Sequence, residues 1–268
     1  SGLTPGTSYD FELAQYETLQ IQGSGDVVSN LSDLSGSIVV ASQPVAAFGG
    51  HEEASICEGT ENSCCADHLE EQLLPRLWLG GSYVCAGSPM RSATDADLWQ
   101  VVSMTPGTVL STNPPVAGLS GVTLDAGEVA FGYHQGSFEL TASHAVMVTQ
   151  FLQGGECVGA TVGDPSQIHG LPTSQYGEEY AVMLSSQFTE HTLVVVRPAG
   201  ATVWLDGAVV TDAQFESVGA GSYEVGHLEV ASGYHSLKGS SPVGVWVYGD
   251  VGFTGYGHLA GFRAQLSN

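Results

Sequence analysis

Residues 136–151 (GSFELTASHAVMVTQF) and 234–248 (YHSLKGSSPVGVWVY) share one pattern, and this pattern decides the fold. In each stretch apolar and polar residues alternate, as in a β-strand with one buried face, and a turn interrupts the alternation. A third version of the pattern is found at residues 36–48 (GSIVVASQPVAAF). Because proline fixes φ and cannot donate to a strand ladder, the Ser-x-Pro steps predict turns between paired strands.

A second pattern is found twice, from Leu74-Pro75 to Leu110 and from Leu171-Pro172 to Leu205. Equivalent prolines in the two copies are separated by close to a hundred residues, a period that indicates duplication. Glycine makes up 36 of the 268 residues, which favours short strands joined by many turns. We therefore predict an all-β protein of two packed β-sandwich-like lobes, built from an internal repeat of about 95–100 residues.

The repeat divides the chain into three parts that we expect to pack as one compact region. Residues 1–72 form an N-terminal half unit with a cysteine-rich loop, which should complete one of the lobes with strands at 18–22 and 36–48. Residues 73–170 and 171–268 form the first and second full repeats. The Asp-Gly step after Leu205 predicts a tight hairpin, since glycine tolerates positive φ. One short helix is predicted near 66–74, and a single barrel is the alternative architecture.

The charge balance excludes several classes of partner. Five Lys and Arg face 28 Asp and Glu, giving a formal net charge of −23. A surface this acidic repels phosphate, so we expect neither nucleic-acid binding nor adhesion to anionic lipid. No run of 18 apolar residues is present, so membrane insertion is not expected either. The chain starts without Met or a signal-peptide pattern, from which we expect a removed signal or a segment of a longer chain.

Five cysteines are the disulfide candidates: Cys57, Cys64, Cys65, Cys85 and Cys157. Four of them gather in and after a polar loop without strand signals, where covalent links would replace a missing core. We expect one bond from Cys57 to Cys64 or Cys65 and another involving Cys85, which leaves Cys157 over. The spacing does not fit a zinc site, and buried reduced thiols are the alternative. Disulfides indicate an exported protein.

Two stretches carry a family resemblance: SQPVAAFGGH at 42–51 and CCADHLEEQ at 64–72, followed by Pro75 and Trp78. They resemble the IgGFc-binding protein N-terminal domain family, in particular its secreted bacterial members. The resemblance implies an extracellular or cell-surface location and a role in binding or adhesion without catalysis. The residues that match its motif are His51, Cys65, Asp67, His68, Glu70 and Gln72.

The same motif holds the only ionisable cluster to consider. On the predicted helix, Asp67 would share a face with Glu70 or Glu71, and these carboxylates are weak Ca²⁺ candidates. We assign no catalytic residue and no cofactor other than this Ca²⁺; a hydrolase-type site at Asp67 and His68 is the least favoured alternative. The helix would otherwise only cap the cysteine loop. Four tryptophans are expected in the core first and as ligand-stacking groups second: Trp78, Trp99, Trp204 and Trp246.

These observations predict a secreted or cell-surface, non-enzymatic binding module that recognises a protein or a glycan. The alternative is a structural subunit of an extracellular filament, sheath or surface layer, formed by self-association of the β-rich repeats into a homopolymer. Like-charge repulsion opposes the alternative unless salt or divalent cations screen it.

Overall fold

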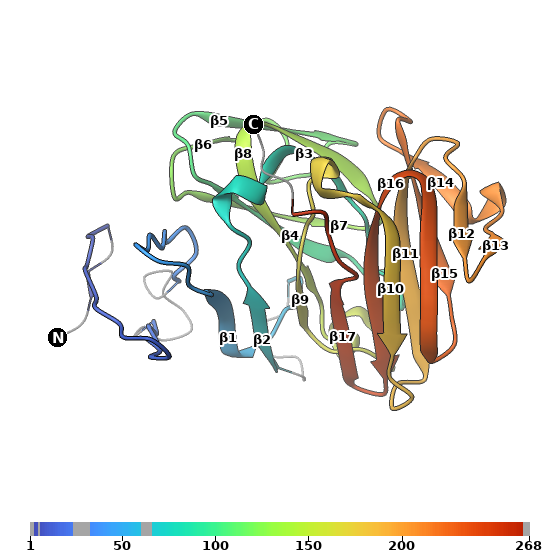
Figure 1. Ribbon diagram of the computed structural model, residues 1–268, viewed down its shortest axis with the longest axis horizontal. Coiled ribbons are helices and arrows are strands. Elements are labelled where there is room, and N and C mark those ends of the chain that lie inside the picture. Colours follow the sequence, from blue (N-terminus) through green and yellow to red (C-terminus); the bar gives the residue numbers. More distant parts are fainter. Residues whose placement is uncertain (1–2, 5, 24–32, 60–65, 265–268) are drawn as a thin grey trace.

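Two β lobes lie side by side in the computed structural model, which describes residues 3–4, 6–23, 33–59 and 66–264 (Figure 1). Strand pairing among these residues is antiparallel throughout. Lobe 1 consists of β3 (Gly80–Cys85), β4 (Asp97–Ser103), β5 (Thr108–Asn113), β6 (Thr123–Leu124), β7 (Val129–His134), β8 (Phe138–Leu152) and β9 (Ser166–His169). Lobe 2 consists of β10 (Gly177–Leu184), β11 (Glu190–Pro198), β12 (Val203–Leu205), β13 (Ala208–Val209), β14 (Phe215–Val218), β15 (Tyr223–Glu229), β16 (Gly233–Val251) and β17 (Thr254–Leu259). The predicted all-β fold of two lobes is confirmed.

Each lobe has one long strand whose first and last parts pair with different neighbouring strands. The first part of β8 pairs with β3 and β5, and its last part pairs with β4 and β9. In lobe 2, β16 pairs first with β10 and β12 and then with β11 and β17. The long alternating stretches that decide the fold are these two strands.

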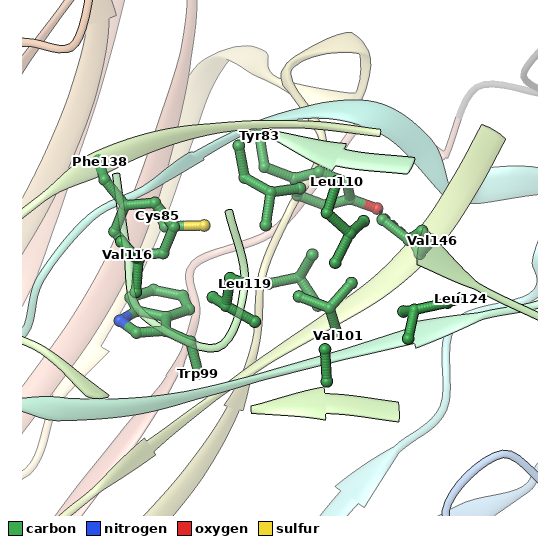
Figure 2. Packing of buried hydrophobic residues seen from close by; sticks show 13 residues of the cluster. Tyr83, Cys85, Trp99, Val101, Leu110, Val116, Leu119, Leu124, Phe138 and Val146 are labelled. Atoms are coloured by element: carbon green, nitrogen blue, oxygen red, sulfur yellow. Dashed lines mark hydrogen bonds between the residues drawn. The ribbon is translucent and has the colours of Figure 1, made fainter. Parts of the chain in front are cut away.

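Alternation buries one side of the strands in three clusters. The first fills lobe 1 around Trp99, Leu110 and Phe138 (Figure 2). Another fills lobe 2 around Leu193 and Val245. The third joins the lobes, because one sheet of lobe 2 packs its outer side against lobe 1; its members include Val84, Ala86, Leu152, Ile168, Val194, Val196, Trp246 and Tyr248. Trp99 and Trp246 are in the core, as predicted.

The two lobes repeat a side-chain contact as well as a pairing scheme. In lobe 1, the Tyr83 hydroxyl accepts the N–H of Gly80 at 3.2 Å and donates to the carbonyl of Val146 at 2.6 Å. In lobe 2, the Tyr180 hydroxyl donates to the carbonyl of Val243 at 2.6 Å. Both hydroxyls are buried where β3 or β10 meets the bend of the long strand, so each fixes the geometry of that bend.

The predicted helix near 66–74 is wrong. Residues Asp67–Gln72 form strand β2, which pairs with β1 (Phe48–Ala54) in a sheet of its own. Within β2 only Leu69 is fully buried, and polar side chains lie on both sides of it. Pairing with β1 satisfies the backbone hydrogen bonds, so the cross-strand partner overrides the helical propensity of the Leu-Glu-Glu-Gln sequence.

The N-terminal segment also differs from the prediction. Residues 18–22 and 36–47 form no strand, so among the described residues the half unit completes neither lobe. The strands of the half unit, among its described residues, are β1 and β2. The predicted Asp-Gly hairpin is confirmed, since β12 and β13 pair through Asp206 and Gly207, both with positive φ. No helix among the described residues has the length and hydropathy that a membrane crossing requires.

A disulfide joins Cys57 to Cys157, with Cα atoms 5.4 Å apart and a sequence separation of 100. The predicted bond from Cys57 to Cys64 or Cys65 is therefore wrong, as is the prediction that Cys157 is left over; Cys64 and Cys65 themselves lie outside the described residues. Cys85 is not the bridge that we predicted but a free thiol facing the core of lobe 1. Folding of lobe 1 sets the true pairing.

Candidate functional site

The family-motif residues lie on the β1–β2 hairpin, where strand geometry spreads them over two faces. His51 of β1 pairs in register with Leu69 of β2. His68 and Glu70 lie on one side of β2, with His68 Nε2 at 3.4 Å from Glu70 Oε2, and both side chains are exposed. Asp67 accepts the backbone N–H of His68 at 2.7 Å. Cys65 lies outside the described residues, and Gln72 ends β2 opposite Phe48.

This arrangement does not assemble the predicted ion or hydrolase site. In a strand, neighbouring odd and even positions point to opposite faces, so Asp67 does not share a face with Glu70 as it would on a helix, although it does share one with Glu71. Across the described ranges, no three His, Cys, Asp or Glu side chains are grouped to hold a metal ion. Calcium binding stays a prediction.

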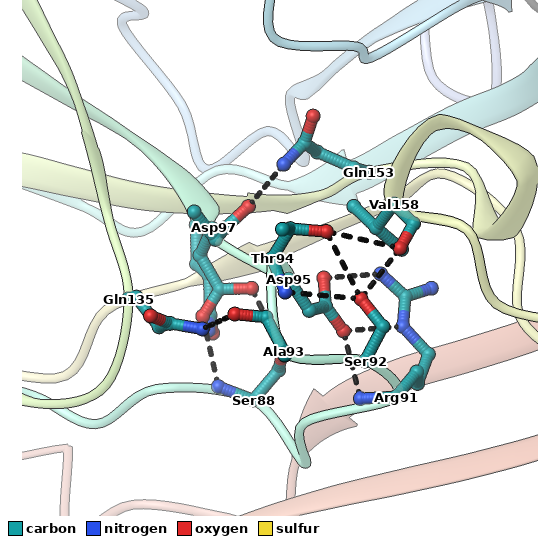
Figure 3. Close-up of polar contacts among 12 residues, drawn as sticks. Ser88, Arg91, Ser92, Ala93, Thr94, Asp95, Asp97, Gln135, Gln153 and Val158 are labelled. Carbon is teal, nitrogen blue, oxygen red and sulfur yellow. Dashed lines mark hydrogen bonds and ion pairs between the residues drawn. The ribbon is translucent and has the colours of Figure 1, made fainter.

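A network of buried polar groups fixes the loop between β3 and β4 (Figure 3). Arg91 donates from Nε and Nη2 to the Asp95 carboxylate at 2.8 and 2.9 Å, and both side chains are buried. Asp97 accepts the N–H and the hydroxyl of Ser88, both at 2.8 Å, and the amide of Gln150 at 2.7 Å. The carboxylates are engaged within the protein, so this network anchors the loop and offers no open site.

Three carboxyl groups have pKa values raised to about 6 or 7. Burial raises the pKa of Asp97 to about 6, against the hydrogen bonds from Ser88 and Gln150 that stabilise its charged form. Burial raises the pKa of Glu71 to about 7. The pKa of Asp164 is raised to about 6 by burial and by the charge of a neighbouring carboxylate. All three groups therefore bind a proton more tightly in the folded chain than in the unfolded one.

We expect the contribution of Asp97 to the free energy of unfolding to fall as the pH rises from 5 to 8, whereas the buried His169, whose pKa is lowered to about 4, makes a contribution of opposite sign. The stabilising contribution of such a carboxyl group is complete below its unfolded pKa, about 4, and is lost as the pH rises through its folded pKa. Asp97 alone should account for about 1–2 kcal/mol of the fall. Urea denaturation at constant ionic strength measures it. The Asp97→Asn variant cannot titrate at this position, so the difference in free energy of unfolding between wild type and variant should shrink as the pH rises; profiles that run parallel would show that Asp97 is not responsible.

The outward side of β10, β12 and the first part of β16, here termed the open face, is the candidate binding surface. It holds a shallow groove of about 600 Å³. Tyr234 is 61% exposed and Met183 73% exposed. The side chains of the open face are Glu179, Ala181, Met183, Trp204, Tyr234, Ser236 and Lys238.

Polar contacts shape the edges of the open face. Lys238 Nζ lies 2.7 Å from Glu179 Oε1 across the strand pair. Asp206, in the β12–β13 hairpin, accepts the N–H of Ser236 at 2.8 Å and lies 2.7 Å from His235 Nδ1. The hairpin is therefore pinned to β16, and two aromatic rings and a thioether are held beside an ion pair. Such a surface fits an apolar side chain or a flat ring with polar groups around it.

The equivalent face of lobe 1 is covered. By register, Glu139 of β8 corresponds to Ser236, since Val84 pairs with Glu139 as Ala181 pairs with Ser236. Glu139 Oε2 accepts the N–H of Ala220, from the turn between β14 and β15 of lobe 2, at 3.0 Å. The lobe 1 face is thus an internal docking surface, and the open face is its uncovered counterpart.

Sequence reasoning found only part of this surface. It named Trp204 as a core residue first and a stacking residue second, and the structure places it in the lining of the groove. It did not single out Met183, Tyr234 or Lys238. The sequence did contain a signal for two of them: Met183 and Tyr234 occupy outward positions of alternating strands, where a large apolar side chain needs an explanation.

Comparisons with known proteins identify a family. A family model described as IgGFc binding protein matches residues 1–249. A comparison with curated proteins finds no match. Among solved structures, the chain is similar to an anti-sigma factor domain-containing protein at 9% sequence identity, with a TM-score of 0.20 over 70% of this chain and 84% of that chain. A score this low carries no argument about fold or function.

Proposed function

The chain belongs to the IgGFc binding protein family, and from this membership we propose that it is an extracellular, non-enzymatic module that binds a protein partner through the open face of lobe 2. The observation that carries the proposal is the contrast between two equivalent faces. The face of lobe 1 is buried by a protein surface, namely lobe 2, whereas the open face presents large apolar side chains to solvent. A surface of this kind on an acidic protein is typical of a protein-binding site.

Two further observations support the proposed extracellular location and the kind of partner. The Cys57–Cys157 disulfide is of the kind that persists in oxidising compartments, which supports export. The net charge of −23 favours a partner with a basic surface, whose association would be fastest at low ionic strength. A glycan is the second candidate partner, because Trp204 and Tyr234 could also stack on sugar rings.

Binding of an immobilised IgG Fc fragment, the partner named by the family, is the direct test by surface plasmon resonance. Wild-type chain should bind, and the double variant Trp204→Ala, Tyr234→Ala should bind at least about tenfold more weakly, as expected when aromatic anchors are removed. The matched control is Val109→Ala, which truncates a half-exposed apolar side chain on β5 of lobe 1.

Each outcome is informative. Equal affinity of the double variant and the wild type would contradict the assignment of the open face. Binding to a glycan array, lost in the double variant, without binding to Fc would favour the glycan. Wild-type chain that binds neither probe would contradict the transfer of the family's partner class to this chain.

A further inference from the structure

The β1–β2 hairpin is a third copy of a hairpin that ends each lobe. The register of β1–β2 places Phe48 opposite Gln72, and that of β16–β17 places Trp246 opposite Leu259. Phe48 and Trp246 also follow the same Pro-Val step, since each lies three residues after Val45 or Val243. Phe48 therefore occupies in the N-terminal hairpin the position that Trp246 occupies in lobe 2.

Trp246 shows what this position does. Its side chain is 3% exposed and packs in the interlobe cluster with Val84 and Ala86, on the face of lobe 1 that corresponds to the open face. By register, Val84 corresponds to Ala181, and Ala86, two residues on, to Met183. In the interlobe cluster, an aromatic residue from the second part of one long strand thus shares the core with the apolar residues on the face of the preceding lobe.

The counterparts of both sides of this contact, the aromatic residue and the apolar face, are exposed to solvent elsewhere in the chain. Phe48 is 57% exposed, and Met183 is 73% exposed. They belong to opposite ends of the molecule: β1 lies beside the N-terminal segment, and lobe 2 forms the other end (Figure 1). A surface and its complement at opposite ends form a head-to-tail contact, which propagates and does not close on itself as a symmetric dimer does.

We propose that the open face of lobe 2 receives the β1–β2 hairpin of a second copy of this chain, with Phe48 packed against Ala181 and Met183. The proposal rests on the proposed function, since it names the protein partner of the same face. The contact would repeat the interlobe interface of this structure between two copies. Lobe 2 of one copy would take the place of lobe 1, and the β1–β2 hairpin of the next copy would take the place of the β16–β17 hairpin.

Charge sets the conditions for this association. Each copy carries a formal charge of −23, so long-range repulsion opposes the contact at low ionic strength. Salt screens that repulsion, and the apolar contact between Phe48 and Met183 does not depend on it. Self-association should therefore increase with salt, the opposite of what is expected for a basic partner.

Sedimentation velocity of the full chain over a range of concentrations, at low and high NaCl, tests the proposal. Wild-type chain should form species that grow with concentration and with salt. Phe48→Asp and Met183→Asp should each weaken association at least about tenfold, because each places a charge in an apolar contact. Val109→Asp, on lobe 1, is the matched control and should behave as wild type.

Mixing the two variants gives the sharpest outcome. Phe48→Asp keeps an intact open face and Met183→Asp keeps an intact hairpin, so their mixture should form a one-to-one dimer that cannot grow. A strictly monomeric wild type at all salt concentrations, or assembly that both variants leave unchanged, would overturn the proposal. A monomer that still binds Fc or a glycan through Trp204 and Tyr234 would overturn it while leaving the proposed function standing.

Discussion

Replacing Arg197 by methionine is expected to lower the free energy of unfolding by about 3–5 kcal/mol, the range for removing one member of a buried ion pair. The Arg197 side chain is 1% exposed, and its guanidinium lies 2.7 Å from Glu224 Oε2. It also donates to the carbonyl of Ala201 at 2.8 Å and lies over the ring of Phe215, 3.7 Å from its centroid. Methionine keeps much of the volume, so the loss would come from the unpaired carboxylate and carbonyl.

Two further variants separate the causes of this loss. Arg197→Lys keeps the charge but not the planar fork that reaches three partners at once, so it should recover only part of the stability. Arg197→Met combined with Glu224→Gln should also recover part of it, because the uncompensated charge is gone. The partner Asp212 is 87% exposed and should contribute little. Urea denaturation measures all four chains, and a loss below 1 kcal/mol in Arg197→Met would contradict the argument.

Arg197 also shows where sequence reasoning stops. Alternation placed residues 191–205 in β-strands, and the structure has β11 and β12 there. The same pattern gave no reason to bury a cation, and Arg197 had no visible partner, because Glu224 lies on a strand that becomes its neighbour only through the pairing of β11 with β15. Strand existence is a local property of a sequence, whereas strand order is not.

The same limit explains the errors at the hairpin and the cysteines. Residues 67–72 have the composition of a helix, and only the β1 partner makes them a strand. Cys57 was paired with its sequence neighbours because loop closure favours short loops. Its true partner is brought close by the fold of lobe 1, since Gly154 donates its N–H to the Ile56 carbonyl at 3.1 Å.

The second large effect is expected from the Cys57–Cys157 disulfide. Replacing both cysteines by serine should lower the free energy of unfolding by about 2–5 kcal/mol, because the bond closes a long loop in the unfolded chain. In the folded chain the bond ties the loop between β1 and β2 to the segment after β8, alongside the Gly154–Ile56 backbone hydrogen bond and a contact from Glu58 N–H to Gln153 Oε1 at 2.6 Å. Urea denaturation measures the loss of stability, and limited proteolysis measures the loosening of the loop that the bond ties down.

Loss of the bond should act first on the N-terminal hairpin. β1 and β2 form strand pairs only with each other, and Leu69 is the only fully buried residue on either strand, so the disulfide adds a covalent link to the packing of β2 beside β9 of lobe 1. Protease should therefore cut the double variant, or the reduced wild type, between the hairpin and β3 while both lobes stay intact. Cys85→Ala is the matched control, since it removes the buried free thiol and should leave the sensitivity to reduction unchanged. Because the hairpin carries Phe48, reduction should also lower head-to-tail association; equal protease resistance with and without the bond would contradict its role as the anchor of that hairpin.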